Sequence, residues 1–148
     1  MTTRFHTDIL NETVEAWVVN VDKGTTDPTG KIEFYTGTPP AALDDAPGAT
    51  LLASVDYQDP AFSAGGAGEL DPGEAEALGV PLATTGLDDG DIGWARILDR
   101  DGTARWDEDN VGTTAEFRIT VNTLTVSTGV DFNVTSHIAS VVSQSDFD

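Results

Sequence analysis

The sequence predicts a mainly β protein, an antiparallel two-layer β-sandwich of jelly-roll-like type with one N-terminal α-helix. Apolar residues recur at helical spacing only near the N-terminus, and alternation with a period of two dominates after residue 30. Turn signals separate short candidate strands, and the length of 148 residues suits one domain. We expect an N-terminal arm over residues 1–7, one sandwich domain over 8–143 and an acidic tail over 144–148.

The segment 8–22 is predicted to form an amphipathic helix. Its apolar residues fall on one helical face. Thr7 or Asp8 can cap its start, and Lys23 with Gly24 supplies a stop signal. The β-branched content leaves a strand as the alternative for this segment. The residues on the predicted buried face are Leu10, Val14, Trp17, Val18 and Val21.

Two strands follow in the first half of the chain. Ile32 and Phe34 alternate with polar neighbours, and the two prolines at 39 and 40 prevent this strand from continuing. A second alternating run covers Leu51, Ala53, Val55 and Tyr57. Residues 60–90 are rich in Gly and Pro, which predicts a long irregular excursion with short strands near 61–63 and 81–84. Such loops are usually functional or mobile, and disorder is the alternative for this acidic stretch.

The second half shows the clearest strand patterns. Residues 91–98 and 103–106 flank a turn at Asp99–Gly102, which predicts a hairpin. Alternation over 116–121 predicts another strand, and a last strand begins near Val130. Its predicted core face carries Val130, Phe132, Val134, Ile138 and Val142, and its predicted polar face carries Asp131, Asn133, Thr135 and His137.

Composition indicates the environment and excludes several functions. The chain has 26 acidic residues against seven basic ones, for a formal net charge of -19. Self-repulsion at that density is screened best in concentrated salt, so we expect a halophilic protein surrounded by salt counterions. The charge excludes nucleic acid as a partner. We also expect no membrane span and no signal peptide, because no apolar run is long enough.

No catalytic residue is predicted. A Ser-His-Asp triad would need His6 or His137 as its base, and the ordinary outcome for a histidine on a polar strand face is a solvated or hydrogen-bonded side chain. Acidic pairs are so frequent that their spacing identifies no glycosidase site. We therefore expect a protein that is not an enzyme and binds no cofactor.

No specific metal site is predicted either. The loop that starts at Asp107 begins like an EF-hand, but Val111 and Arg118 stand where ligands are needed. Looser cation sites stay open at two acidic clusters, and counterion binding on a solvated face is the favoured interpretation. These clusters are Asp88, Asp89 and Asp91, and Asp99 with Asp101.

A few residues remain as candidates for recognition. Asn133 is a better glycosylation candidate than Asn11, since Asn11 falls on the predicted helix. Trp17, Trp94 and Trp106 could form a sugar-binding platform, but alternation favours the core for Trp94 and Trp106. Residues that are harder to bury are candidates for a partner interface, where Tyr and Arg are enriched. They are Arg4, Phe5, His6 and Tyr35.

Several short segments follow one another in a fixed order. They are T-R-F near the N-terminus, I-E-F-Y-T-G-T-P-P (32–40), A-T-L-L-A (49–53), P-A-F (60–62), G-W-A-R-I-L-D-R-D-G-T (93–103), V-G-T-T-A-E-F (111–117), V-S-T-G-V-D-F (126–132) and V-T-S (134–136). This order resembles a family of small β-rich proteins that are encoded by tailed bacterial viruses and prophages. Trp94-Ala95-Arg96 departs from the W-F-R that is usual in that family, and the middle of this chain is more acidic.

The resemblance implies a virion protein of the head or tail region, and it carries over no catalytic residue. With the acidic charge, it points to a tailed virus of a halophilic archaeon. We expect a capsid decoration or cement protein, a homo-oligomer that contacts the major capsid protein or other virion proteins on the head surface. The alternatives are a tail or head-tail connector subunit, and a host-surface glycan-binding or adhesion module.

Overall fold

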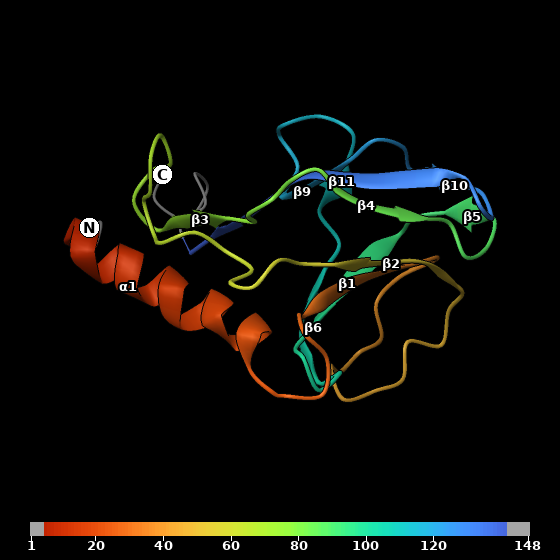
Figure 1. Ribbon diagram of the computed structural model, residues 1–148, viewed down its shortest axis with the longest axis horizontal. Coiled ribbons are helices and arrows are strands. Elements are labelled where there is room, and N and C mark those ends of the chain that lie inside the picture. The colour runs from red at the N-terminus through yellow and green to blue at the C-terminus, as the bar shows by residue number, and fades with distance from the viewer. Residues whose placement is uncertain (1–4, 142–148) are drawn as a thin grey trace.

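The computed structural model describes residues 5–141, and in it one N-terminal helix precedes several packed β-sheets (Figure 1). Arg4 and the predicted tail 144–148 lie outside the described residues. The elements are α1 (Thr7–Val18), the 3-10 helix η1 (Val19–Asp22), β1 (Lys31–Tyr35), β2 (Leu51–Asp56), β3 (Glu74–Glu76), β4 (Leu82–Thr85), β5 (Gly90–Asp91), β6 (Trp94–Leu98), β7 (Ala104–Glu108), β8 (Val111–Gly112), β9 (Ile119–Val121), β10 (Thr125–Val126) and β11 (Asp131–Ser140).

One layer is an antiparallel sheet with the strand order β2-β1-β6-β7. Phe34 lies opposite Ala53 on one side and Ala95 on the other, and all three side chains are buried. The β6-β7 hairpin closes at the predicted turn, where the N–H of Gly102 donates to the carbonyl of Asp99. The sequence prediction of this hairpin is therefore confirmed.

The other layer is built along β11, the longest strand. Along one edge of β11, β4 pairs with its first half and β3 with its last residues. Along the other edge β11 pairs with β9, which has the short parallel strand β8 beside it. A small antiparallel pair of β5 and β10 lies at the end of the molecule that is remote from α1 (Figure 1).

The main core lies between these layers. The rings of Phe34 in one sheet and Phe132 in the other meet edge to face, with centroids 5.0 Å apart. Branched aliphatic side chains from both sheets surround this contact, and α1 contributes Val14 and Val18 to the same cluster. The predicted fold class, a mainly β sandwich with one N-terminal helix, is confirmed.

The helix forms where the sequence predicts it, with two differences at its ends. His6 rather than Thr7 or Asp8 is the N-cap, and its Nδ1 accepts the N–H of Asp8 at 3.2 Å. The α-helix ends at Val18, and the 3-10 helix η1 continues to Asp22. No helix within the described part of the chain has the length and apolar character to cross a membrane.

Strand β11 corrects one sequence expectation. The strand has a register shift between Val134 and Ser136, where its pairing with β9 is irregular. A shift of one residue moves every later side chain to the other face. His137 is therefore buried rather than on the polar face, and Ile138 is only half-buried. Val130 precedes the strand and is exposed, whereas Val142 lies outside the described residues.

The outer face of the first sheet carries a second buried cluster. Trp94 is fully buried, stacks on Tyr35 at 4.8 Å and donates from its indole nitrogen to the carbonyl of Thr36. Arg96 lies over the Trp94 ring and forms a two-pronged ion pair with Asp107. Its remaining nitrogen reaches the carbonyl of Asp45 in the loop between β1 and β2. This loop therefore closes over the outer face of the sheet.

The excursion 60–90 is ordered by short pairings. The strand expected near residues 81–84 is β4, whereas the one expected near 61–63 is a single bridge from Phe62 to Ala77. Strand β3 has no counterpart in the predicted elements. The N–H of Ser63 and the N–H of Gly66 both donate to carbonyls of β3, which holds the excursion beside α1.

Candidate functional site

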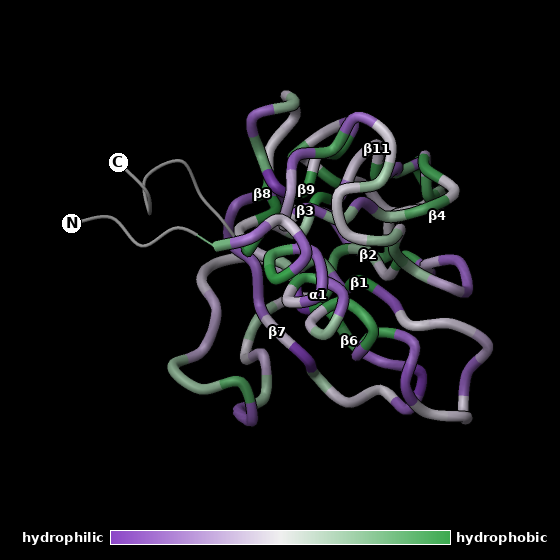
Figure 2. Tube along the Cα trace, turned by 90° about the vertical axis from the view of Figure 1, so that its left-hand side faces the viewer, coloured by the Kyte–Doolittle hydropathy of each residue, from purple (hydrophilic) through white to green (hydrophobic). Residues whose placement is uncertain are grey.

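Three large apolar side chains are exposed along the N-terminal segment: Phe5 just before α1, Ile9 within α1 and Val19 at the start of η1. Phe5, Ile9 and Val19 are each about half exposed, at 51%, 50% and 49%. Viewed from the helix side, α1 lies in front of the sheets, with β3 above it and β6 and β7 below (Figure 2). We call the surface formed by these three residues the helix face.

The charged side chains of α1 and η1 are all acidic. Asp8 and Glu12 are exposed on the same side of α1, and residues 5–22 contain no Lys or Arg. The side chain of Lys23 follows directly after η1 and is exposed. A partner that covers the helix face therefore meets apolar groups among carboxylates.

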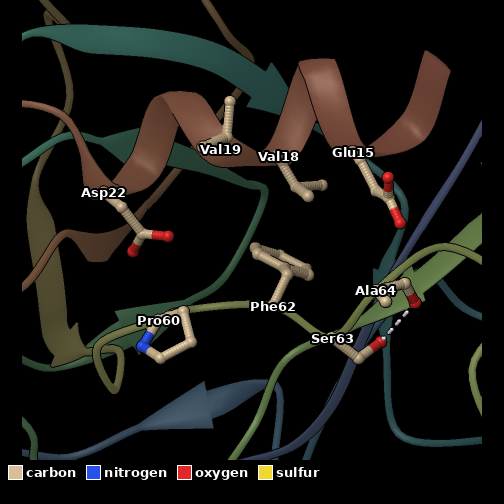
Figure 3. Close-up of a pocket in the computed structure, with 8 residues that line it drawn as sticks. All are labelled: Glu15, Val18, Val19, Asp22, Pro60, Phe62, Ser63 and Ala64. Atoms are coloured by element: carbon tan, nitrogen blue, oxygen red, sulfur yellow. Dashed lines mark hydrogen bonds between the residues drawn. The ribbon is translucent and has the colours of Figure 1, made fainter. Parts of the chain in front are cut away.

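A groove runs beside the helix face, between α1 with η1 and the segment 60–64 (Figure 3). Its volume is about 290 Å³. Val18 and Phe62 line its centre, while Glu15 and Asp22 lie toward opposite ends (Figure 3). Val19 belongs both to the groove and to the helix face. The two surfaces are therefore continuous.

Both carboxylates of the groove hold the facing segment in place. Glu15 Oε1 accepts the N–H of Gly65 at 2.8 Å, and Asp22 Oδ1 accepts the N–H of Ala61 at 3.0 Å. Burial raises the pKa of Asp22 above its usual value, although the bond from Ala61 acts in the opposite direction. The sequence contains the acids but no signal that pairs residues 15 and 22 with residues 61–65.

The close approach of this segment requires glycine at position 65. A Cβ on Gly65 would lie 2.6 Å from the carbonyl oxygen of Asn11 and 2.7 Å from its Cα. The amide oxygen of Asn11 also accepts the N–H of Gly73 at 2.9 Å. The wall of the groove is thus fixed to α1 at several points.

Behind the groove lies a layer of aromatic rings. Trp17 of α1 meets Trp106 of β7 edge to face at 5.1 Å, and Phe62 meets His137 at 5.2 Å. His137 Nδ1 lies 2.8 Å from the hydroxyl of Tyr57. Burial, aided by the charge of Arg118, lowers the pKa of His137 to about 3. His137 is therefore neutral near pH 7 and enclosed by protein.

The predicted interface residues separate in the structure. Phe5 and His6 lie at the start of α1 and are exposed, and Arg4 lies outside the described residues. Tyr35 is buried on the outer face of the first sheet, with its hydroxyl 3.1 Å from Glu33. The expectation that Tyr35 is hard to bury is wrong, because its ring stacks on Trp94 of the neighbouring strand β6.

The two acidic clusters that stayed open as cation sites bind their own loops. Asp89 Oδ1 accepts the N–H of Thr128 at 2.8 Å, and Asp91 Oδ1 accepts the Thr125 hydroxyl at 2.8 Å. Asp99 accepts two backbone N–H groups and pairs with Arg105 at 2.6 Å. Within residues 5–141, no three His, Asp or Glu side chains are grouped to hold a metal ion.

The remaining recognition candidates lie within the fold. Asn133 is half-buried inside β11, and its N–H donates to the side chain of Asn122 at 2.8 Å. The placement of Trp94 in a core is confirmed, and Trp106 packs against the main core while partly buried. The indole nitrogen of Trp106 is buried and has no hydrogen-bond partner within the described part of the chain. These rings form no exposed platform.

Comparisons with known protein families, curated proteins and solved structures found no match to this chain.

Proposed function

We propose that this protein is a non-enzymatic structural component of a tailed-virus particle, and specifically a capsid decoration protein that stabilises the head in high salt. The observation that carries the proposal is the helix face. The segment of α1 and η1 presents Phe5, Ile9 and Val19 to the outside of an acidic protein, beside a groove. The order of segments from T-R-F to V-T-S supports a virion role by resemblance.

The distribution of groups over the molecule supports a two-ended arrangement on a particle. The helix face and its groove would contact the major capsid protein or another virion protein. The opposite end, with Asp88, Asp89, Asp91 and Asp131 in neighbouring loops and strand ends, would face brine and its counterions. Copies arranged on a capsid lattice would form the homo-oligomer that the sequence predicts.

A tail or head-tail connector subunit is the nearest alternative, because it would use the same apolar docking surface. The glycan-binding alternative loses its tryptophan platform, since Trp94 is buried and Trp106 packs on the core. Only the Gly-rich excursion 63–90 still supports it.

Imaging of intact particles tests the proposal directly. Cryo-electron microscopy of purified virions should show density for this sandwich on the head surface, with α1 toward the shell. Density confined to the tail would contradict the role of a capsid decoration protein and support that of a tail subunit. Absence of the chain from purified particles, measured by mass spectrometry, would overturn the virion role.

A further inference from the structure

The groove beside α1 combines an apolar centre with acidic ends. Phe62 lies between Glu15 and Asp22 and faces α1 (Figure 3). Val18 and Pro60 extend the apolar lining. A side chain with an aliphatic stem and a charged head matches this arrangement, since Lys and Arg cover apolar surface with their stems while the head stays polar.

The carboxylates are already in position for a cationic head. Glu15 and Asp22 each use one oxygen to accept a backbone N–H of the segment 61–65. An ionised carboxylate offers about four acceptor sites over its two oxygens, so capacity remains on both. Because neither side chain has to be ordered on binding, the entropic cost of an ion pair is lower here than on a free surface.

The Asp22 end of the groove favours a cation most. Burial disfavours the ionised form of Asp22, and the nearby charge of Asp59 acts in the same direction. Arg100 offsets part of this effect, but it also bonds the carbonyl of Asp27 and pairs with Asp59 at 3.9 Å. An incoming cation would compensate this partly desolvated carboxylate.

A second copy of this chain is a poor source of that cation. The chain has seven Lys and Arg residues. Five of them already pair with acids of the same chain, which leaves Lys23 and Arg4, and Arg4 lies outside the described residues. These five are Lys31, Arg96, Arg100, Arg105 and Arg118. Two copies would also bring together two surfaces of the same negative sign. The charge therefore favours a different protein.

We propose that the groove binds an arginine or lysine side chain of a partner protein. The stem lies on Val18 and Phe62, and the head pairs with Asp22. Apolar side chains beside that residue on the partner then cover Val19 and Ile9 on the helix face. As a description of a virion contact this inference rests on the proposed function, but the groove chemistry can be tested without any particle.

The test uses N-acetyl-arginine methyl amide as the probe and the citrulline analogue, which is neutral and of the same shape, as its control. Amide NMR spectra of the full chain are recorded in molar KCl. The arginine probe should cause saturable shifts at Val19, Ala61 and Gly65. The apparent affinity for the citrulline analogue, taken from the same titration, should be at least about fivefold weaker. A charge-assisted hydrogen bond is about twice as strong as a neutral one.

Variants locate the head group. Asp22→Asn keeps an acceptor for the N–H of Ala61 and should remove the preference for arginine over citrulline. Asp131→Asn lies at the end of the molecule remote from α1, at the start of β11, and should leave that preference unchanged. Equal responses to both probes in the unmodified chain, or a preference that survives Asp22→Asn, would overturn the inference. If the groove binds the arginine probe but the protein is absent from virions, the groove inference stands and only the proposed function is refuted.

Discussion

The two ends of the molecule, one at α1 and the other (the far end) around β5, β10 and the start of β11, both carry exposed apolar residues and acids, but only the α1 end has its acids across an apolar groove. The helix end exposes Phe5, Ile9 and Val19, and the far end exposes Leu87, Leu124 and Val130. Acids accompany both sets. At the far end Asp89 and Asp91 bind threonine groups of the neighbouring loop at 2.8 Å.

At the helix end, Glu15 and Asp22 also bind backbone groups, but they do so across a groove of about 290 Å³ with an apolar centre. Exposed apolar residues and acids therefore do not identify a docking site by themselves. A built groove with pre-positioned carboxylates distinguishes the helix end.

The largest expected effect concerns the buried layer beneath α1. An unfolded histidine has a pKa near 6.5, and the folded pKa of His137 is lowered to about 3 by burial. The neutral form is thus favoured in the fold, so its stabilisation is complete above pH 6.5 and is lost as the pH falls toward 3. The free energy of unfolding should fall by up to about 1.4 kcal/mol per pH unit in that window.

The check is urea unfolding between pH 6.5 and 5, above the range where most carboxylates titrate. His137→Gln can still bond the hydroxyl of Tyr57. Its free energy of unfolding should change less steeply with pH than that of the unmodified protein, because about one proton fewer is taken up on unfolding. Identical slopes for the variant and the unmodified protein would show that His137 is not held neutral.

Lowering the salt concentration should destabilise the far end before the helix end. Asp88, Asp89, Asp91 and Asp131 are crowded there, and dilution from molar to about 0.1 M salt lengthens the screening distance from about 3 to 10 Å. The melting temperature should fall by several degrees, because self-repulsion grows. Amide hydrogen exchange should rise first over residues 86–91. A melting temperature that does not change with salt would contradict the halophilic interpretation.

Removing one acid should loosen the wall of the groove. Glu15→Ala leaves the part-buried N–H of Gly65 without its acceptor, which costs about 1–3 kcal/mol. Glu15→Gln keeps an oxygen at that position and should cost much less. Urea midpoints of the two variants measure the difference. Equal losses would mean that the hydrogen bond does not hold the segment.

The smallest effect is expected at the far end. The N–H and hydroxyl of Thr128 lower the pKa of Asp89, so its stabilisation is present above the unfolded value of 3.8 and is lost as the pH falls through the folded pKa. Asp89→Asn should lower the melting temperature slightly at pH 7 and by less at pH 3. A loss of equal size at both pH values would show that the charge is unimportant.

The regular elements could be predicted because their patterns are local. The spacing of Val14, Val18 and Val21 identifies the buried face of the helix, and all three are buried. Alternation around Phe34 and the turn at Asp99–Gly102 likewise place β1 and the β6-β7 hairpin. Each of these signals lies within a window of a few residues.

The candidate site could not be predicted because it depends on contacts between distant segments. The groove joins residues 15–22 to residues 60–64 through a segment with little regular structure. The register shift in β11 leaves no mark in the alternation of apolar and polar residues. Alternation therefore places His137 on the polar face, although its side chain is buried. The burial of Tyr35 depends on its stacking against Trp94 in the neighbouring strand. The alternation of apolar and polar residues within one strand does not predict that contact.

We propose that the helix end, and not the far end, docks on a partner. The most direct measurement is the number of copies per virion when particles assemble with Ile9→Asp/Val19→Asp or with the matched far-end variant Leu87→Asp/Val130→Asp. Both pairs replace exposed side chains, so circular dichroism should show intact folds. The helix-end variant should lose at least about tenfold occupancy, equivalent to ~1.4 kcal/mol. Equal occupancy for both variants, or a loss confined to the far-end variant, would contradict the account.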